Sequence, residues 1–269
     1  MNRPHRPIPE SAVETISQFL RAHALGTGSD GVVVGLSGGV DSALVARLAR
    51  DALGAARVLG LLLPDTTMPP ALVAETEEYG RSLGIETRTI PIDPMEDAFR
   101  GALPEVRDRV ALGNTTARIR MTVLYAVARE RRRLVVGTGN KSELLLGYFT
   151  KYGDGGADLL PIGDLYKGEV WGLAAELGIP PSIRERAPTA GFWEGQTDEG
   201  ELGATYAEID SVLRGLEELR REPEIVAETG LPPELVRGIL GRVEMYRHKR
   251  RLPPVAKLGL RTVGIDWRD

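Results

Sequence analysis

A short segment near the amino terminus has the composition of an anion-binding loop. It reads Ser-Gly-Gly-Val-Asp-Ser over residues 37–42, directly after the apolar run 31–36 and directly before a stretch of helical periodicity. A helix that begins straight after a strand presents free backbone N–H groups and the positive end of its dipole, and glycines let the backbone approach a ligand closely. The segment therefore predicts a phosphate or pyrophosphate site. A glycine-rich turn used only for packing would share part of this pattern.

Two acidic residues stand where they could hold a metal ion beside such a phosphate. Asp41 lies in the first turn of the helix expected after the loop, a position that the helix dipole alone already favours for an acid. Mg²⁺ is usually held by one or two carboxylates together with phosphate oxygens, so Asp41 also fits a magnesium ligand. Glu143 follows Asn140 by three residues, which is the spacing of a helix capping box. On the residues alone, the cap is the simpler interpretation of Glu143.

The elements around the loop alternate between strand-like and helical stretches. Strands are expected at residues 31–36, 57–64, 87–92 and 134–137, and helices at residues 11–24, 40–53, 70–83, 114–132 and 140–146. Continuous apolar strands are typical of a parallel sheet that is covered on both faces. Their alternation with helices predicts an α/β fold with an open, doubly wound, mainly parallel sheet flanked by helices.

The pattern changes after residue 148. Helices are expected at residues 167–177, 206–221 and 232–247, and the turn-rich stretch 187–202 has little periodicity and is predicted to be a loop. This part is therefore interpreted as a helical C-terminal elaboration of the sheet. Because no linker or repeat interrupts residues 1–269, we expect a single domain.

Composition limits the function classes. The chain has 34 basic and 38 acidic residues and a net charge of −4, so it has no overall attraction for nucleic acid. It has no cysteine, which excludes disulfides, thiolate zinc sites and a catalytic thiol. Residues 1–10 lack the apolar core of a secretory signal, and no apolar stretch approaches the roughly 18 residues that a membrane span needs. We expect a cytoplasmic protein that binds neither nucleic acid nor a membrane.

Two motifs resemble a known family. The hexamer 37–42 resembles the Ser-Gly-Gly-X-Asp-Ser signature of the N-type ATP pyrophosphatases. A second block, Val-Gly-Thr-Gly-Asn-Lys-Ser-Glu over residues 136–143 and Gly-Tyr-Phe-Thr-Lys-Tyr-Gly-Asp-Gly-Gly-Ala-Asp over residues 147–158, closely resembles the long signature of the NAD synthetases within that superfamily. Shorter matches follow in the family's order at residues 114–118, 187–189, 206–210 and 246–251. On these motifs the chain is identified as a member of the NAD synthetases.

The resemblance implies an activity. It implies an adenine nucleotide alpha hydrolase-like fold, with ATP-dependent amidation of deamido-NAD to NAD through an adenylated intermediate and release of AMP and pyrophosphate. It also implies Mg²⁺ as cofactor, ATP as co-substrate and a homodimer. Some members obtain ammonia from a glutaminase domain with a cysteine nucleophile; since this chain has no cysteine, we expect free ammonia or a separate glutaminase subunit. Two alternatives stay open, the ATP-pyrophosphatase subunit of another amidating synthetase and a non-catalytic adenine-nucleotide binding module.

The resemblance also implies roles for individual residues. Those expected to contact ATP are Gly35, Leu36, Ser37, Gly38, Gly39, Val40, Asp41, Ser42, Thr138, Lys167 and Thr189. Asp41 and Glu143 would hold Mg²⁺, and deamido-NAD would contact Arg118, Lys151, Asp158, His248 and Lys249. Asp41, Lys167 and Asp158 are expected to be catalytic, with Asp158 as a group that could bind ammonium or take its proton. The binding residues could also be ordinary surface and loop charges.

One departure limits the transfer of roles. Many members read Gly-Thr-Asp-His before the glutamate, whereas this chain reads Gly-Thr-Gly-Asn over residues 137–140. No role of that aspartate or histidine is carried over.

Overall fold

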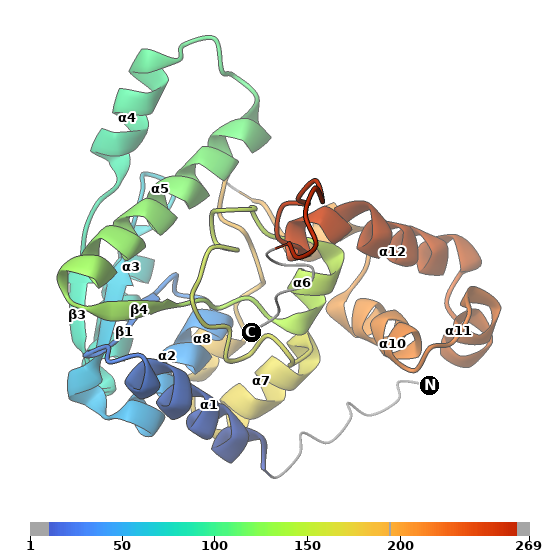
Figure 1. The fold of residues 1–269 in the computed structure, drawn as a ribbon, viewed down its shortest axis with the longest axis horizontal. Helices are drawn as coiled ribbons and strands as arrows, with labels where there is room; N and C mark the ends of the chain where they lie inside the picture. The colour runs from blue at the N-terminus through green and yellow to red at the C-terminus, as the bar shows by residue number, and fades with distance from the viewer. Residues whose placement is uncertain (1–10, 194, 263–269) are drawn as a thin grey trace.

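The centre of the fold is a parallel sheet. The computed structural model describes residues 11–193 and 195–262, so the segment 1–10, where no signal is expected, lies outside the described residues. The strands are β1 (Gly31–Gly35), β2 (Val58–Leu62), β3 (Glu86–Thr89) and β4 (Arg133–Val136), in the order β3-β2-β1-β4 (Figure 1). All pairs are parallel, and Val32 at the centre pairs with Val58 on one side and Leu134 on the other. The predicted α/β class and parallel sheet are confirmed.

Helices surround the sheet and extend beyond it. They are α1 (Ala12–Gly26), α2 (Val40–Leu53), α3 (Pro70–Ser82), α4 (Asp93–Ala102), α5 (Arg109–Glu130), α6 (Lys141–Leu146), α7 (Lys167–Glu176), α8 (Pro181–Arg184), α9 (Asp198–Leu202), α10 (Tyr206–Glu217), α11 (Glu222–Thr229) and α12 (Pro233–Met245). Short 3₁₀ turns cover Ala55–Arg57 and Tyr246–Arg250. No helix in the part of the chain that is described is long and apolar enough to cross a bilayer.

Both faces of the sheet are buried, which explains the continuous apolar runs. Val32 and Val34 of β1 pack with α1 and α2, whereas Val33 between them packs with α5. Figure 1 shows α5 across the sheet from α1 and α2. Each fully buried aliphatic side chain of this kind contributes about 1.5–3 kcal/mol to stability. The sheet is therefore held from two sides, as a doubly wound fold requires.

Several predicted boundaries are wrong. The helix predicted over residues 206–221 ends earlier, at Glu217, because Leu219 adopts a positive φ of 59°, and α11, a separate helix without a predicted counterpart, begins at Glu222. The helix predicted over residues 114–132 begins earlier, at Arg109, where the Asp108 side chain accepts the Ala111 N–H at 2.7 Å as an N-cap. Helix α4 has no counterpart among the predicted helices, and the predicted loop 187–202 ends in α9. The strand predicted over residues 87–92 covers 86–89.

The helical C-terminal part has a core of its own. Buried side chains of α10, α11 and α12 pack together with Leu146 at the end of α6 and with Tyr166 before α7. This cluster places α10 beside the beginnings of α6 and α7 (Figure 1). The predicted C-terminal elaboration is confirmed, and it lies against the two helices that follow the sheet.

The strand order reverses between β1 and β4. The chain runs from β1 through β2 to β3 on one side and then returns to place β4 on the other side of β1. In open α/β sheets, ligands bind outside the carboxyl ends of the strands at such a switch point. Here β1 leads into residues 37–42 and α2, and β4 leads into residues 137–140 and α6. The fold therefore brings the two sequence motifs together.

Candidate active site

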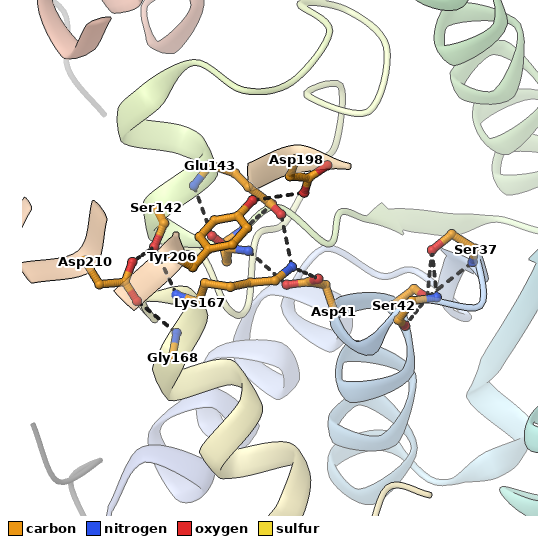
Figure 2. Close-up of polar contacts among 12 residues, drawn as sticks. Ser37, Asp41, Ser42, Ser142, Glu143, Lys167, Gly168, Asp198, Tyr206 and Asp210 are labelled. Carbon is orange, nitrogen blue, oxygen red and sulfur yellow. Dashed lines mark hydrogen bonds and ion pairs between the residues drawn. The ribbon is translucent and has the colours of Figure 1, made fainter. Parts of the chain in front are cut away.

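The predicted phosphate loop forms a tight turn between β1 and α2. The Ser37 N–H donates to Ser42 Oγ at 3.2 Å, and the Ser42 hydroxyl donates to the Gly39 carbonyl at 3.0 Å (Figure 2). Gly38 has a φ of +81°, a conformation that glycine adopts far more readily than other residues. Helix α2 begins directly after Gly39. The loop thus presents a helix N-terminus at the switch point, as an anion site requires.

Gly38→Ala is expected to weaken nucleotide binding by at least about tenfold, or roughly 1.4 kcal/mol. A Cβ there would lie 2.6 Å from Leu72 Cδ1 and 2.9 Å from Thr76 Oγ1. The Leu72 methyl group can move aside, but the Thr76 hydroxyl is held by donating to the Leu72 carbonyl at 2.6 Å, so either that hydrogen bond or the loop must shift. Isothermal titration with ATP measures the effect.

Gly54→Ala is the matched control for this variant. Gly54 also has a positive φ, +86°, but no described atom outside its immediate neighbours lies within 4 Å of the place where a Cβ would stand. Gly54→Ala therefore has the same backbone cost as Gly38→Ala but none of its steric overlap. Both variants are expected to lose about 1–2 kcal/mol of unfolding free energy in urea. Equal ATP affinity in the two variants would contradict a role for the Gly38 geometry in binding.

Three charged side chains meet beside the phosphate loop. Asp41 comes from the first turn of α2, Glu143 from α6, and Lys167 is the first residue of α7. The Lys167 Nζ lies 2.5 Å from Asp41 Oδ2 and 3.4 Å from Glu143 Oε1 (Figure 2). Lys167 is only 2% exposed, which is rare for a lysine unless it is paired. The structure thus joins three residues that the sequence singled out separately.

Asn140 and Glu143 form a capping box and also belong to this cluster. The Asn140 Oδ1 accepts the Glu143 N–H at 3.0 Å, and Glu143 Oε2 accepts the Asn140 N–H at 3.1 Å. The Asn140 side-chain amide also donates to Asp41 Oδ1 at 2.9 Å. The two interpretations of Glu143 are therefore compatible, because one oxygen completes the cap and the other faces Lys167.

A buried polar clamp fixes the beginnings of α6 and α7. Asp210, 2% exposed on α10, accepts from the Ser142 hydroxyl at 2.5 Å and from the Gly168 N–H at 2.9 Å (Figure 2). The Ser142 oxygen in turn accepts the Lys167 N–H at 2.9 Å. The clamp holds the backbone of Lys167 and that of α6 in one geometry. The sequence marks Asp210 only as part of a family match and does not predict this role.

The burial of the cluster changes its titration. Burial raises the pKa of Glu143 and repulsion by Asp41 adds to this rise, while the positive charge of Lys167 opposes it. Burial disfavours the charged form of Lys167, but the carboxylates of Asp41 and Glu143 outweigh it and raise the pKa of Lys167. Lys167 is therefore charged at neutral pH, and Glu143 is poised to gain or lose a proton when the charge beside it changes.

The acidic side chains of the cluster match what Mg²⁺ requires when a substrate supplies further ligands. Within residues 11–193 and 195–262, no group of three or more His, Cys, Asp or Glu side chains has the geometry of a metal site. Asp41 and Glu143 supply two carboxylates that both face one point, which is the number that magnesium usually takes when substrate phosphates complete its shell. The residues fit a magnesium ion that is bound together with phosphate oxygens.

The sequence assigns no role to two further residues of the cluster, Asp198 and Tyr206, although Tyr206 begins the family match at residues 206–210. Asp198, the first residue of α9, is 4% exposed, and its Oδ2 accepts the Tyr206 hydroxyl at 3.0 Å (Figure 2). Burial raises the pKa of Asp198, whereas Lys167 lowers it, and burial raises the pKa of Tyr206. No local pattern around residue 198 marks it, because the loop before it lacks periodicity.

The residues expected to contact deamido-NAD gather at the loop after α6, with one exception. The Arg118 Nε donates to the Lys151 carbonyl at 3.3 Å, and the Lys151 Nζ donates to the His248 carbonyl at 3.0 Å. The Lys249 Nζ donates to the Gly147 carbonyl at 2.7 Å and the Phe149 carbonyl at 2.6 Å. Segments from α5, the loop and the last 3₁₀ turn are thereby joined, and their cations form one basic region.

Asp158 is the exception. Its Oδ2 accepts the Val135 N–H at 2.7 Å, and its Oδ1 accepts the Tyr125 hydroxyl at 3.1 Å. Both oxygens of Asp158 are therefore engaged between β4 and α5. Its catalytic and substrate-binding roles stay predictions.

Two predicted ATP contacts lie on segments near the loop. Thr138 lies two residues after the end of β4. Thr189 is exposed, and its hydroxyl oxygen accepts the Gly191 N–H at 3.0 Å. Three residues before Thr189, Arg186 donates to the Gly38 carbonyl and pairs with Glu75 of α3. Arg186 thus ties this segment to the phosphate loop, but the threonine contacts stay predictions.

Known proteins resemble the chain over almost its full length. A family model described as NAD synthase matches residues 12–253. The NH(3)-dependent NAD(+) synthetase of Methanosarcina acetivorans is 48% identical over 252 residues, 93% of this chain and 98% of that protein. The NMN synthetase structure from Francisella tularensis has a TM-score of 0.84 and 35% identity, and the match covers 94% of this chain and 100% of that one. The NH3-dependent NAD synthetase structure from Campylobacter jejuni has a TM-score of 0.78 and 34% identity, and covers 92% and 98%.

Proposed function

The chain belongs to the NAD synthase family, and on that premise we propose that it is an enzyme that converts deamido-NAD to NAD with ATP and ammonia. The observation that carries the proposal is the buried Lys167, held by Asp41 and Glu143 beside the phosphate loop. A charged lysine next to a helix N-terminus is suited to phosphate chemistry.

The first step that we propose is adenylation. An oxygen of the nicotinate carboxylate attacks the α-phosphorus of ATP, the bond to the β-phosphate oxygen breaks, and pyrophosphate leaves into the loop 37–42. Both reactants are anions, so positive charge must already be in place in the transition state. The Lys167 ammonium and the loop N–H groups supply this positive charge. The contacts of Asp210 and Ser142 fix the backbone at Lys167, so that the lysine does not have to reorient during the reaction.

Magnesium would be held by Asp41 and Glu143 together with phosphate oxygens. When bound, the ion supplies positive charge that the phosphates need during transfer. In the protein alone, the Lys167 ammonium lies between the two carboxylates, and Asn140 orients Asp41 through its side-chain amide. These contacts hold both carboxylates beside the phosphate loop before ATP and magnesium bind.

The second step that we propose is amidation. Ammonia attacks the adenylated carboxyl carbon, the bond from that carbon to the AMP oxygen breaks, AMP leaves with the bonding electron pair, and the nitrogen gives up one proton to water. Four further properties stay proposals: a homodimer like that expected for the family, a single domain over residues 1–269, a cytoplasmic location, and ammonia delivered by a separate glutaminase subunit.

An amidation assay with two nitrogen donors tests the proposed function. Purified protein is incubated with ATP, Mg²⁺ and deamido-NAD, with ammonium or glutamine, and NAD, AMP and pyrophosphate are measured. NAD, AMP and pyrophosphate in equal amounts with ammonium alone are expected. Nicotinate mononucleotide in place of deamido-NAD serves as the comparison substrate. ATP binding without any turnover would favour a nucleotide-binding module, and ADP with orthophosphate would contradict adenylation.

Arg118→Ala is expected to raise the KM for deamido-NAD by about 10- to 100-fold, the cost of about 1.5–3 kcal/mol for one charged hydrogen bond. Arg118 is exposed on α5 beside the basic loop, so its loss leaves the phosphate loop untouched. The KM for ATP should change less than about threefold. Arg129→Ala, an exposed arginine on the same helix, is the control. Similar effects of both variants would contradict a specific contact.

A further inference from the structure

Asp198 brings a third carboxylate to the charged cluster. It stands at the start of α9, and its negative charge acts on both Lys167 and Glu143. With Asp41 and Glu143, three acids face one lysine. Figure 2 shows the Asp198 carboxylate beside the Tyr206 hydroxyl, near Glu143. The proposed adenylation step assigns no role to Asp198.

One oxygen of Asp198 is buried without a partner. The Oδ2 accepts the Tyr206 hydroxyl, whereas the Oδ1 has no hydrogen-bond partner among the described residues, although Asp198 is only 4% exposed. The Tyr148 hydroxyl lies near Asp198 and opposes the rise in its pKa, but it donates to Glu201 at 2.7 Å. A buried polar atom in a native protein is normally satisfied, and an orphaned one calls for an explanation. A carboxylate oxygen can only accept, so the missing partner is a group with N–H or O–H donors or a cation.

The surroundings of Asp198 favour a small cation with N–H groups. The ring of buried Tyr206 attracts positive charge, since the Lys167 Nζ lies 5.3 Å from its centroid. Trp171 meets the Tyr206 ring edge-on, with the ring centroids 5.9 Å apart. The unpartnered Asp198 oxygen and the Tyr206 ring together offer a cation one acceptor and one aromatic face.

The two aspartates that could bind ammonium differ in what they offer. Asp158 has both oxygens engaged, one by a backbone N–H of β4 and one by the Tyr125 hydroxyl. Asp198 has one oxygen pinned and one free within the described part of the chain, and it lies beside the Lys167 that is expected to act on the adenylate. Asp198 can therefore bind a ligand without giving up its hydrogen bond to Tyr206.

We propose that Asp198, pinned by Tyr206, binds the ammonium substrate through its Oδ1 and holds the nitrogen beside the adenylation site. This inference rests on the proposed function, because it assigns the place of one of its substrates. Ammonium donates one N–H to Oδ1, and its charge faces the Tyr206 ring. Before the attack the bound ammonium gives one proton to water, because only ammonia has the lone pair that forms the new bond. Asp198 would be a substrate-binding residue that does not take part in adenylation.

Asp198→Asn separates ammonium binding from adenylation. It keeps the size of the side chain and removes the charge. The KM for ammonium is expected to rise by about 10- to 100-fold, the effect of losing one charge-assisted hydrogen bond. The KM values for ATP and deamido-NAD should stay within about threefold of wild type. Deamido-NAD-dependent ATP–pyrophosphate exchange without ammonium should stay within the same range, because adenylation needs no nitrogen donor.

Glu201→Gln is the matched control. Glu201 lies on the same short helix, is exposed, and accepts the Tyr148 hydroxyl at 2.7 Å. Its KM for ammonium is expected to stay within about threefold of wild type. A KM for ammonium that is unchanged in Asp198→Asn, or raised equally in Glu201→Gln, would overturn the inference. A parallel loss of exchange would also overturn it, since Asp198 would then serve ATP or its metal.

A second variant decides the matter if Asp198→Asn does not fold. Tyr206→Phe keeps the ring and the Asp198 charge but releases the Oδ2. Its KM for ammonium is expected to rise about three- to tenfold with exchange retained, and an unchanged KM would overturn the inference. Wild-type protein without any deamido-NAD-dependent exchange would instead overturn the proposed function itself.

Discussion

Lys167→Met should reduce deamido-NAD-dependent ATP–pyrophosphate exchange by at least about 1000-fold. Removing a single preorganised donor from a site of this kind costs about 100- to 1000-fold, and Lys167 also carries the positive charge between the two carboxylates. Methionine matches the length of the lysine stem, so the packing against α2 and α6 is kept. Exchange of labelled pyrophosphate into ATP measures adenylation alone, before ammonia enters.

The same variant should also be less stable. Loss of the ammonium leaves Asp41 and Glu143 facing each other without their shared cation, and breaking a buried ion pair costs about 3–5 kcal/mol. We expect the lower end, about 3 kcal/mol in urea denaturation, because Glu143 can take up a proton. Lys141→Met is the control, since Lys141 begins α6 but pairs with Glu217 and Asp164. Exchange above about a tenth of wild type in Lys167→Met would remove Lys167 from adenylation.

Asp41→Ala should abolish adenylation, with a fall in exchange of at least about 100-fold, or about 2.7 kcal/mol of transition-state stabilisation. Asp41 is the residue that both Lys167 and Asn140 hold in place beside the loop, and it is expected to bind magnesium. Stability should also fall, because the buried Lys167 ammonium and the Asn140 amide lose their acceptor and only the longer contact of Lys167 with Glu143, at 3.4 Å, remains. The exchange rate is measured over a range of Mg²⁺ concentrations.

Asp51→Ala tests whether the effect depends on position. Asp51 lies near the other end of α2 and pairs with Arg47 and Arg50. Its loss removes the same charge from the same helix, and exchange should stay within about threefold of wild type. Full activity in Asp41→Ala, or an equal loss in both variants, would remove Asp41 from the proposed metal site.

Much of the sheet could be predicted because its residues report their environment locally. Strands buried on both faces must be apolar throughout, and the prediction for α2 covers the residues that it occupies, 40–53. Some missed elements did carry a signal. Helices α4 and α11 both begin with a proline in the first turn and acidic residues beside it, which are ordinary helix-start features.

The site itself was predictable only where a motif marks it. Asp41 and Glu143 stand in recognisable loops, yet the contact between Asn140 and Asp41 joins positions 99 residues apart and no local pattern encodes it. Asp210 lies on a helix, where an acid is usually exposed, and it is buried only because two helix N-termini need its oxygens. Asp198 follows an irregular segment, and its place in the site is evident only from its hydrogen bond with Tyr206 in the folded structure.

The Asp210 clamp also sets when the protein can begin to work during its synthesis. The phosphate loop, Asp41 and Glu143 are all made before the carboxylate that fixes the start of α7, which arrives on α10, 42 residues after its partner Gly168. While α10 is still inside the ribosome, α6 and α7 lack the acceptor that sets their starts. Nucleotide capture by a nascent chain would therefore report that the C-terminal helices have emerged and docked.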